Sequence, residues 1–184
     1  MNGWGLPTSL AVGGKTYPIN ADYRDILEVI ACLQDPDEDP MIRQYVALSL
    51  FYEGFETMPQ ADYQQAMEEL ARFIDLGEDQ ADSPPRAKTI DWEQDRIIIA
   101  SEINKVAGME VRALPFLHWW TFMGYFSAIG EGQLSMVVAI REKLRKGKKL
   151  EPWEREYYRE NRSQIDFRRK YTSAEDELVK SWGF

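Results

Sequence analysis

The sequence predicts a mainly α-helical single domain of about six helices, with an N-terminal β-hairpin and a charged C-terminal helical arm. Three observations support this fold class. Apolar residues recur at three- and four-residue spacing along most of the 184-residue chain. Two short alternating runs flank a Gly-Gly pair near the N-terminus. A hydrophobic content of 44%, with 12% aromatic residues, is sufficient for a core and argues against general disorder.

Residues 8–19 are predicted to form the hairpin. Gly13 and Gly14 lie between its two runs, and glycine readily supplies the positive φ angles that a tight hairpin turn requires. Pro18 places the second run at an edge. By alternation, one face can be shared by Leu10, Val12, Tyr17 and Ile19. A lone hairpin is marginally stable, so we expect it to pack on the helices.

Three helices are predicted to follow, from Tyr23 to Leu33, from Met41 to about Tyr52, and from about Gln60 to Ile74. Asn20 or Asp22 can cap the first. The expected buried faces are Tyr23, Ile26, Leu27, Ile30 and Leu33, then Met41, Tyr45, Leu48 and Tyr52, then Tyr63, Ala66, Met67, Leu70, Phe73 and Ile74. The acidic segment 35–40 lacks the glycine and terminal glutamate of a calcium loop, so we interpret it as a solvated loop.

The polar segment 78–88 contains two prolines and no periodicity, which predicts a loop or hinge and the internal segment most prone to disorder. A fourth helix follows, capped by Thr89 or Asp91 and ended by Gly108. Its expected seam is Trp92, Ile99, Ile103 and Val106, widened by Ile98. Later helices are predicted from Leu134 to Lys146 and from Pro152 to about Asn161. The first of these has an apolar face of Leu134, Val137, Val138 and Leu144.

The uncharged segment 114–129 is the most informative part of the chain. It contains the only histidine, His118, followed by Trp119 and Trp120. As a helix from about Phe116, it would be apolar on every side, which predicts burial on every side. It is too short to span a bilayer, so we expect a central core helix. The structural signature residues are therefore His118, Trp119, Trp120 and Phe122, together with Trp92.

No motif in the sequence indicates an enzyme. His118 lacks a recognisable serine or cysteine nucleophile nearby, and a core histidine bound to a main-chain or carboxylate partner is the favoured interpretation. Cys32, the only cysteine, lies in an apolar helical pattern and fits a buried hydrophobe. The Gly13-Gly14 pair has no Gly-Lys-Ser/Thr after it, so it is not a phosphate loop. We expect no catalytic residue, no cofactor and no metal ion.

The net charge of −9 is unevenly distributed. Residues 1–140 hold 9 Lys/Arg and 22 Asp/Glu, whereas residues 141–170 hold 12 and 6. Such a chain can bind intramolecularly, self-associate or engage an acidic partner. The basic segment also carries aromatic residues, which is compatible with nucleic-acid binding, but its interleaved glutamates favour a charge-paired helix surface or a protein-binding arm. The residues predicted to contact a partner are Trp153, Tyr157 and Tyr158.

The order of these features resembles a family of small proteins from the tail gene clusters of siphophages and prophages of Gram-positive bacteria. The resemblance rests on Leu10–Tyr17, Asp22-Tyr-Arg24, Trp92-Glu-Gln-Asp95, His118-Trp-Trp-Thr-Phe122 and Ile140-Arg141. It covers about residues 6–150. It implies a tail-assembly chaperone, or a protein encoded beside one, that coats the tape-measure protein before the tail tube forms. No catalytic residue is implied.

The expected function is therefore non-enzymatic binding and solubilisation of a phage tape-measure protein. The alternatives are a minor tail or baseplate protein retained in the particle and a nucleic-acid binder using residues 141–170. The expected partners are the tape-measure protein, a neighbouring tail chaperone and further copies of the chain, with no membrane contact. The absence of a signal peptide or an apolar spanning run predicts a soluble protein of the bacterial host cytoplasm or the virion tail. We expect residues 1–150 to form the helical domain, with a hinge near 78–90, and residues 151–184 a charged, partly ordered arm.

Overall fold

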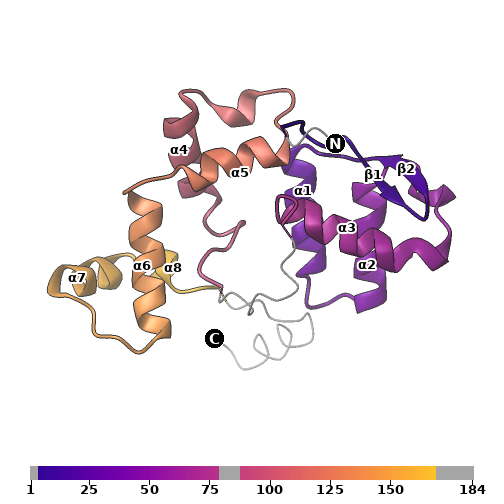
Figure 1. Cartoon of the computed structure of the whole chain (residues 1–184). Helices are drawn as coiled ribbons and strands as arrows, with labels where there is room; N and C mark the ends of the chain where they lie inside the picture. Colours follow the sequence, from indigo (N-terminus) through magenta and orange to yellow (C-terminus); the bar gives the residue numbers. More distant parts are fainter. Residues whose placement is uncertain (1–3, 79–87, 169–184) are drawn as a thin grey trace. The chain divides into compact units, whose positions relative to one another are not determined.

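The computed structural model describes residues 4–78 and 88–168. These are mainly helical, with one two-stranded antiparallel hairpin, which confirms the predicted fold class (Figure 1). The described residues belong to two compact units. The first unit contains residues 4–78 and 116–122, and the second contains residues 88–115 and 123–168. The sequence also predicts a short helix beginning at Ser173. This helix and most of the predicted 78–88 loop lie outside the described residues.

The hairpin consists of β1 (Ser9–Val12) and β2 (Lys15–Pro18), paired so that Leu10 lies opposite Tyr17. Gly13 and Gly14 form the two-residue turn with φ angles of 57° and 78°, as this kind of turn requires. Alternation predicted the buried face correctly, because Val12, Tyr17 and Ile19 are buried and Leu10 is half-buried. β1 packs on α3.

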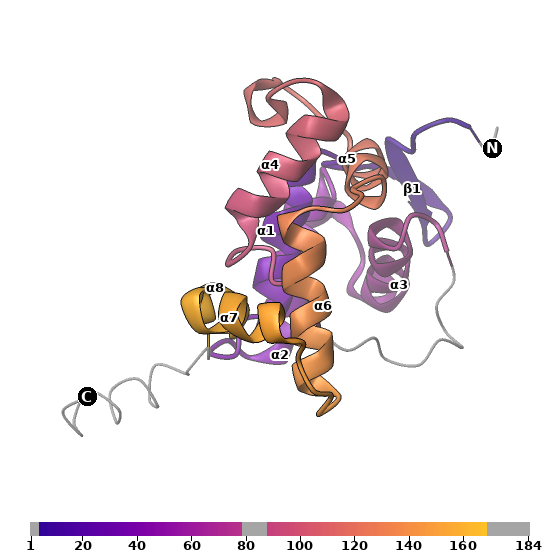
Figure 2. The ribbon, with the colours of Figure 1, turned by 90° about the vertical axis from the view of Figure 1, so that its left-hand side faces the viewer.

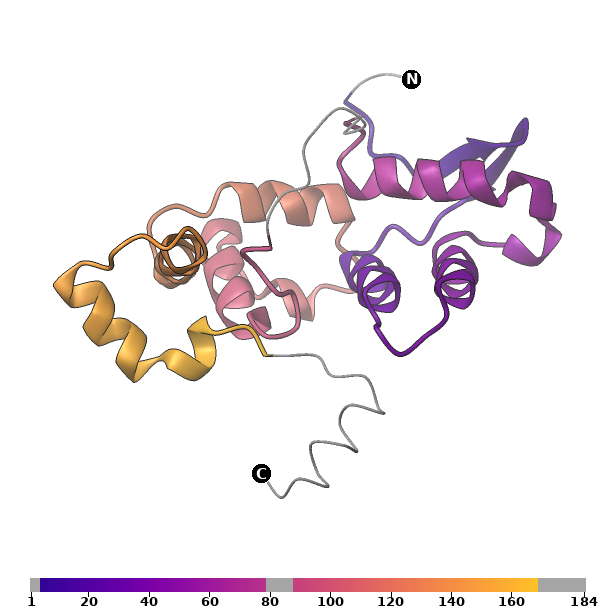
Figure 3. The same ribbon diagram turned by 90° about the horizontal axis from the view of Figure 1, so that it is seen from below.

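Three helices complete most of the first unit: α1 (Tyr23–Leu33), α2 (Pro40–Phe51) and α3 (Tyr63–Ile74). The short 3-10 turns η1 (Phe55–Thr57) and η2 (Gln60–Asp62) connect α2 to α3. Asp22 caps α1, because its carboxylate accepts the backbone N–H of Arg24 at 3.0 Å. Figure 3 shows α1 and α2 side by side, with α3 between them and the hairpin.

The buried faces of α1 and α2 differ from those predicted. In α1 the third buried residue is Val29, while Leu27, Ile30 and Leu33 are only half-buried. In α2, Met41 and Tyr45 are 75% and 53% exposed. The residues buried there are Ala47, Leu48 and Phe51. Both helices carry apolar residues on more than one side, so helical spacing alone cannot select the face that meets a neighbour. In α3 the predicted Ala66, Leu70 and Phe73 are buried.

In the second unit, α4 (Arg96–Ala107) begins four residues later than Trp92. Residues 92–95 form a turn instead, because the Asp91 carboxylate accepts the backbone N–H groups of Glu93 and Gln94. Ile98, Ile99 and Ile103 are buried as predicted. Val106 is exposed, which corrects its assignment to the seam. The 3-10 turn η3 (Val111–Ala113) follows.

The remaining helices of the second unit are α6 (Gln133–Arg145), α7 (Pro152–Glu160) and α8 (Arg162–Ile165). They lie together in Figure 2, where α8 packs on both α6 and α7. In α6, Leu134 and Val137 are buried as predicted, but Ile140 takes the place expected for Leu144, which is exposed. α7 and α8 lie beyond residue 150 and pack within the second unit. The predicted domain boundary at residue 150 stays a prediction.

The predicted core helix is shorter and less buried than expected. α5 (Trp119–Ser127) begins at Trp119, because residues 116–118 are not helical and pair with the start of α1. The helix passes from the first unit into the second after Phe122. Burial on every side is wrong: Trp119 and Phe122 are buried, whereas Phe116, before the helix, is 56% exposed. No helix among residues 4–78 and 88–168 is long and apolar enough to cross a membrane.

Candidate functional site

The chain enters α5 through a short main-chain bridge to α1. Asp22 pairs with His118 across an isolated antiparallel bridge. The N–H of Tyr23 donates to the carbonyl of Leu117 at 2.9 Å, and the N–H of Trp119 donates to the carbonyl of Ala21 at 2.8 Å. The second carboxylate oxygen of Asp22 accepts the N–H of Leu117 at 2.8 Å. One aspartate therefore caps α1 and anchors a segment 95 residues further along the chain.

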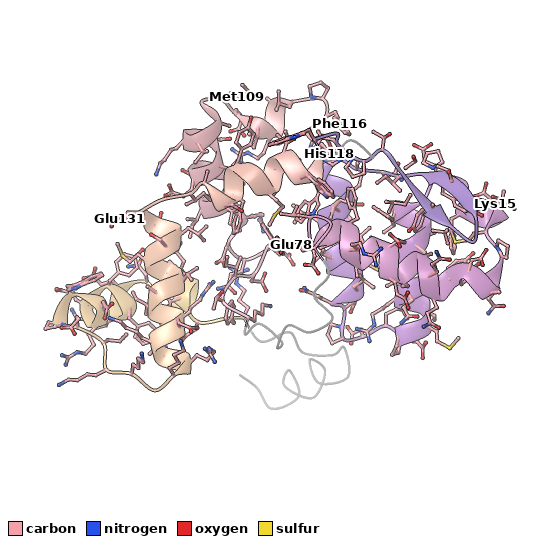
Figure 4. All side chains as sticks on the ribbon, viewed as in Figure 1. Lys15, Glu78, Met109, Phe116, His118 and Glu131 are labelled. Carbon is pink, nitrogen blue, oxygen red and sulfur yellow. The ribbon has the colours of Figure 1, made fainter. Side chains whose placement is uncertain are left out.

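His118 is buried and both of its ring nitrogens contact the main chain. Nδ1 accepts the N–H of Trp120 at 3.0 Å, so it carries no proton in this arrangement. Nε2 then carries the proton and donates to the carbonyl of Pro7 at 3.0 Å. Figure 4 shows the side chain where residues 116–118 lead into α5. These contacts give His118 a structural role, joining the start of α5 to the segment before the hairpin.

The two adjacent tryptophans complete the end of α3. The indole N–H of Trp119 donates to the carbonyl of Ile74 at 3.0 Å, and that of Trp120 donates to the carbonyl of Phe73 at 2.9 Å. The last carbonyls of a helix have no partner within it. The Trp-Trp pair supplies two consecutive donors to them, and the carbonyl of Phe73 also accepts the N–H of Leu76 at 3.1 Å. Trp120 is only half-buried, whereas Trp119 is almost fully buried.

A stack of rings packs beside this pair. The rings of Tyr23 and Phe122 lie parallel, with centroids 4.4 Å apart and an interplanar angle of 6°. Phe122 also stacks on Trp119 at 5.7 Å. Trp92, the remaining signature residue, is half-buried in the second unit, where its ring contacts that of Phe126 at 5.1 Å.

The second unit is centred on a buried ion pair between Asp95 and Arg141. Two hydrogen bonds of 2.6 and 2.9 Å join the guanidinium to the carboxylate, which is 0% exposed. Arg141 also donates to the carbonyls of Ile165, Gln164 and Thr89. These five bonds use all five N–H donors of the side chain. Its guanidinium carbon lies 4.2 Å from the centre of the Phe167 ring.

Gln94, like Arg141, binds the main chain of the predicted C-terminal arm. Its Nε2 donates to the carbonyls of Gln164 and Asp166, and its Oε1 accepts the N–H of Arg168. Ile165 is 1% exposed, so this part of the arm is an integral part of the unit. Sequence reasoning missed the attachment. Within the arm, the only sequence signal for this attachment is a lone isoleucine among charged residues. The side chains that bind the arm come from residues 92–95 and 140–141, two of the segments that carry the family resemblance.

The predicted partner residues lie on or near the surface of α7. Trp153 is 55% exposed, and Tyr157 and Tyr158 are half-buried. The hydroxyl of Tyr158 donates to Asp166 at 2.8 Å, so its polar end serves an internal contact. Trp153 and Tyr157 are four residues apart and share one side of the helix. The structure thus leaves two neighbouring aromatic side chains of α7 accessible to a partner.

α7 is attached to α6 through Glu154. The Lys143 ammonium donates to both oxygens of this carboxylate, at 2.6 and 2.7 Å, and the backbone N–H of Glu151 donates to it at 2.8 Å. These bonds, above all those from Lys143, lower the pKa of Glu154 below its usual value. On α6, Arg145 and Lys146 both bind Glu142 and lower the pKa of that carboxyl to about 2.

Several cations of the basic segment are therefore already paired. Arg141, Lys143, Arg145, Lys146 and Arg162 each contact a carboxylate within the second unit. Nucleic-acid binding depends on cations that are free to neutralise phosphates. The pairing of these side chains makes residues 141–168 a weaker candidate for that function than their composition indicates.

Comparison with known proteins gives one family. A family model described as Bacteriophage Gp15 protein matches residues 5–167. No curated protein and no solved structure matches the chain.

Proposed function

Because the chain belongs to the bacteriophage Gp15 protein family, we propose that it is a non-enzymatic tail-assembly chaperone that binds the tape-measure protein of its phage and keeps it soluble. A tape-measure protein is a very long helical protein with apolar stripes, and such stripes aggregate when they are exposed. A small acidic helical protein with accessible apolar side chains is suited to cover them.

The observation that carries this proposal is the pair of accessible aromatic rings on α7. On α7, which Glu154 attaches to α6, Trp153 is exposed and Tyr157 is half-buried. A partner helix can pack its apolar stripe on two rings spaced one helical turn apart. Aromatic residues of this kind supply much of the binding free energy in protein interfaces. The partner surface predicted from the sequence is thus retained, with Trp153 and Tyr157 as its main contacts.

Co-expression with the tape-measure protein of the same phage tests the proposal. We expect the tape-measure protein to be insoluble alone and to copurify with this chain in the soluble fraction. Trp153→Ala/Tyr157→Ala should reduce the recovered complex by tenfold or more, since hot-spot truncations cost about 2 kcal/mol or more. Met109→Ala is the control, because Met109 is a half-exposed apolar residue of the second unit outside α7.

A tape-measure protein that is equally insoluble with and without this chain would refute the proposal. Mass spectrometry of purified particles addresses the alternative of a structural tail or baseplate protein: stoichiometric presence favours that role, and absence favours the chaperone. Binding to nucleic acid that falls steeply with salt would instead support the basic segment as a nucleic-acid site.

A further inference from the structure

Two oppositely charged surfaces of the chain have no role in the function proposed above. The acidic face consists of residues 35–39 and the adjoining exposed side chains of α2, Met41, Ile42 and Tyr45. The basic turn consists of residues 145–149, between α6 and α7, with the exposed Leu144 before it. The acidic face belongs to the first unit and the basic turn to the second.

The acidic face combines negative charge with exposed apolar area. All of residues 35–39 are exposed, and four of the five are Asp or Glu. Asp35, Glu38 and Asp39 form no ion pair within the described residues. Directly after them, Met41 is 75% exposed and Ile42 is 48% exposed. Apolar side chains beside concentrated charge are typical of a surface that a charged partner covers.

The basic turn has the complementary composition. Arg145 and Lys146 share a single carboxylate, that of Glu142, so the group retains positive charge. Lys148 and Lys149 are exposed and take part in none of the ion pairs of the described chain. The side chain of Leu144, 38% exposed, offers apolar area at the same end of α6.

We infer that the acidic face of one copy of this chain binds the basic turn of a second copy. Charge complementarity supports this choice of occupant. The described part of the first unit has 4 Lys/Arg and 14 Asp/Glu, a net charge of −10, whereas that of the second has 14 and 12, a net charge of +2. Each copy carries both surfaces, and the contact joins two different surfaces. Such heterologous contacts propagate into a ring or an open chain of copies. This inference does not depend on binding to a tape-measure protein.

Sedimentation of the full-length protein over a range of concentrations tests the inference. At about 0.05 M salt, where charges act over more than 10 Å, we expect the mass to rise with concentration. At about 1 M salt the screening length falls to about 3 Å, and the protein should sediment as a monomer. The variants Asp37→Lys/Glu38→Lys and Lys148→Glu/Lys149→Glu should each weaken association at least tenfold, since opposed like charges repel. Neither variant alters a buried residue, and circular dichroism checks that both remain folded.

Mixing the two variants provides the decisive measurement. The first variant keeps an intact basic turn and the second keeps an intact acidic face, so these two surfaces can still bind each other. The reversed acidic face of the first variant is also complementary in charge to the reversed basic turn of the second. The mixture should therefore associate more strongly than either variant alone, with both variants in each complex. Matched controls that change the net charge equally at other exposed positions, Glu53→Lys/Glu56→Lys and Lys15→Glu/Arg155→Glu, should associate like the unaltered chain.

Every outcome bears on the inference. A monomer at all concentrations in low salt overturns it, as does association that persists unchanged in the two variants. Weakening by the controls to the same extent would show that net charge alone, and not these surfaces, governs association. Failure of the mixture to associate overturns the pairing of acidic face with basic turn. A salt-dependent change of shape without a change of mass would show that the two surfaces meet within one molecule, which also overturns it.

Discussion

Replacing Arg141 with methionine should destabilise the second unit by about 3–5 kcal/mol, the usual cost of removing one partner from a buried ion pair. The Asp95 carboxylate is fully buried and, within the described part of the chain, would keep only the backbone N–H of Asp91 as a donor, at 3.0 Å from Oδ2. The carbonyls of Thr89 and Ile165 would also lose the donor that Arg141 supplies. The loss at these carbonyls is small, because water can bind them when the arm loosens.

Amide hydrogen exchange of α6 and α8 in the full-length protein measures this loss, because exchange from the core of a unit reports its free energy of opening. Arg162→Met is the matched control. Arg162 also binds an aspartate, Asp166, but its side chain is 74% exposed, and exposed pairs contribute roughly 0–1 kcal/mol. Exchange in α8 should rise more than in α6 in the Arg141 variant, since Arg141 binds the carbonyls of Gln164 and Ile165 directly.

The double variant Asp95→Leu/Arg141→Met should recover part of the loss, because it leaves no buried charge without a partner. A loss in Arg141→Met no larger than in Arg162→Met would refute the reasoning. The free energy of unfolding lost in the double variant is compared with the losses in Asp95→Leu and Arg141→Met. A double loss equal to the sum of these two would show that the side chains do not act as a pair.

Three further results are expected. Trp119→Ala should cost about 3–5 kcal/mol, and urea unfolding measures the loss. Trp119→Phe should cost about 1 kcal/mol beyond the effect of the smaller ring, because the hydrogen bond to the carbonyl of Ile74 is lost; a loss explained by ring size alone would contradict the capping role. Glu154→Gln should reduce the loss of folding stability that occurs as the pH falls. The folded-state pKa of Glu154 is lowered, so the carboxylate stabilises the fold above its usual pKa of about 4.3, and this stability is lost as the pH falls through the lowered pKa. A parallel pH profile in the variant would be inconsistent with this. Asp22→Ala should cost about 1–3 kcal/mol, because it removes a helix cap and leaves the buried N–H of Leu117 without its acceptor; an unchanged melting temperature would exclude both roles.

The helices and the hairpin could be predicted from the sequence because their signals are local. Gly13 and Gly14 indicated the turn, Asp22 indicated the start of α1, and Gly108 indicated the end of α4, where its φ is 70°. The chemistry of each signal acts within a few residues, so no knowledge of distant parts of the chain was needed. The start of α5 is the exception: the aromatic spacing extended to Phe116, but pairing of residues 116–118 with α1 delays the helix to Trp119.

The candidate site was predictable only in part. Exposure of Trp153 follows from its position in a highly charged helix, and the structure agrees. The sequence does not predict the acidic face, because helical spacing places Met41 and Tyr45 on a buried stripe, whereas both are exposed. Helical spacing tells which residues share a side, but the position of α1 decides which side of α2 is covered.

The sequence by itself therefore determined the fold class, most element boundaries and the uneven charge, all of which depend on neighbouring residues. Only the tertiary structure decided which distant groups meet. Asp95 and Arg141 are separated by 46 residues, and Asp22 and Leu117 by 95. The identity of a charged residue in a sequence does not show whether its side chain is solvated or buried. Its role is settled only when folding brings a partner within hydrogen-bonding distance and removes the water that would otherwise solvate it.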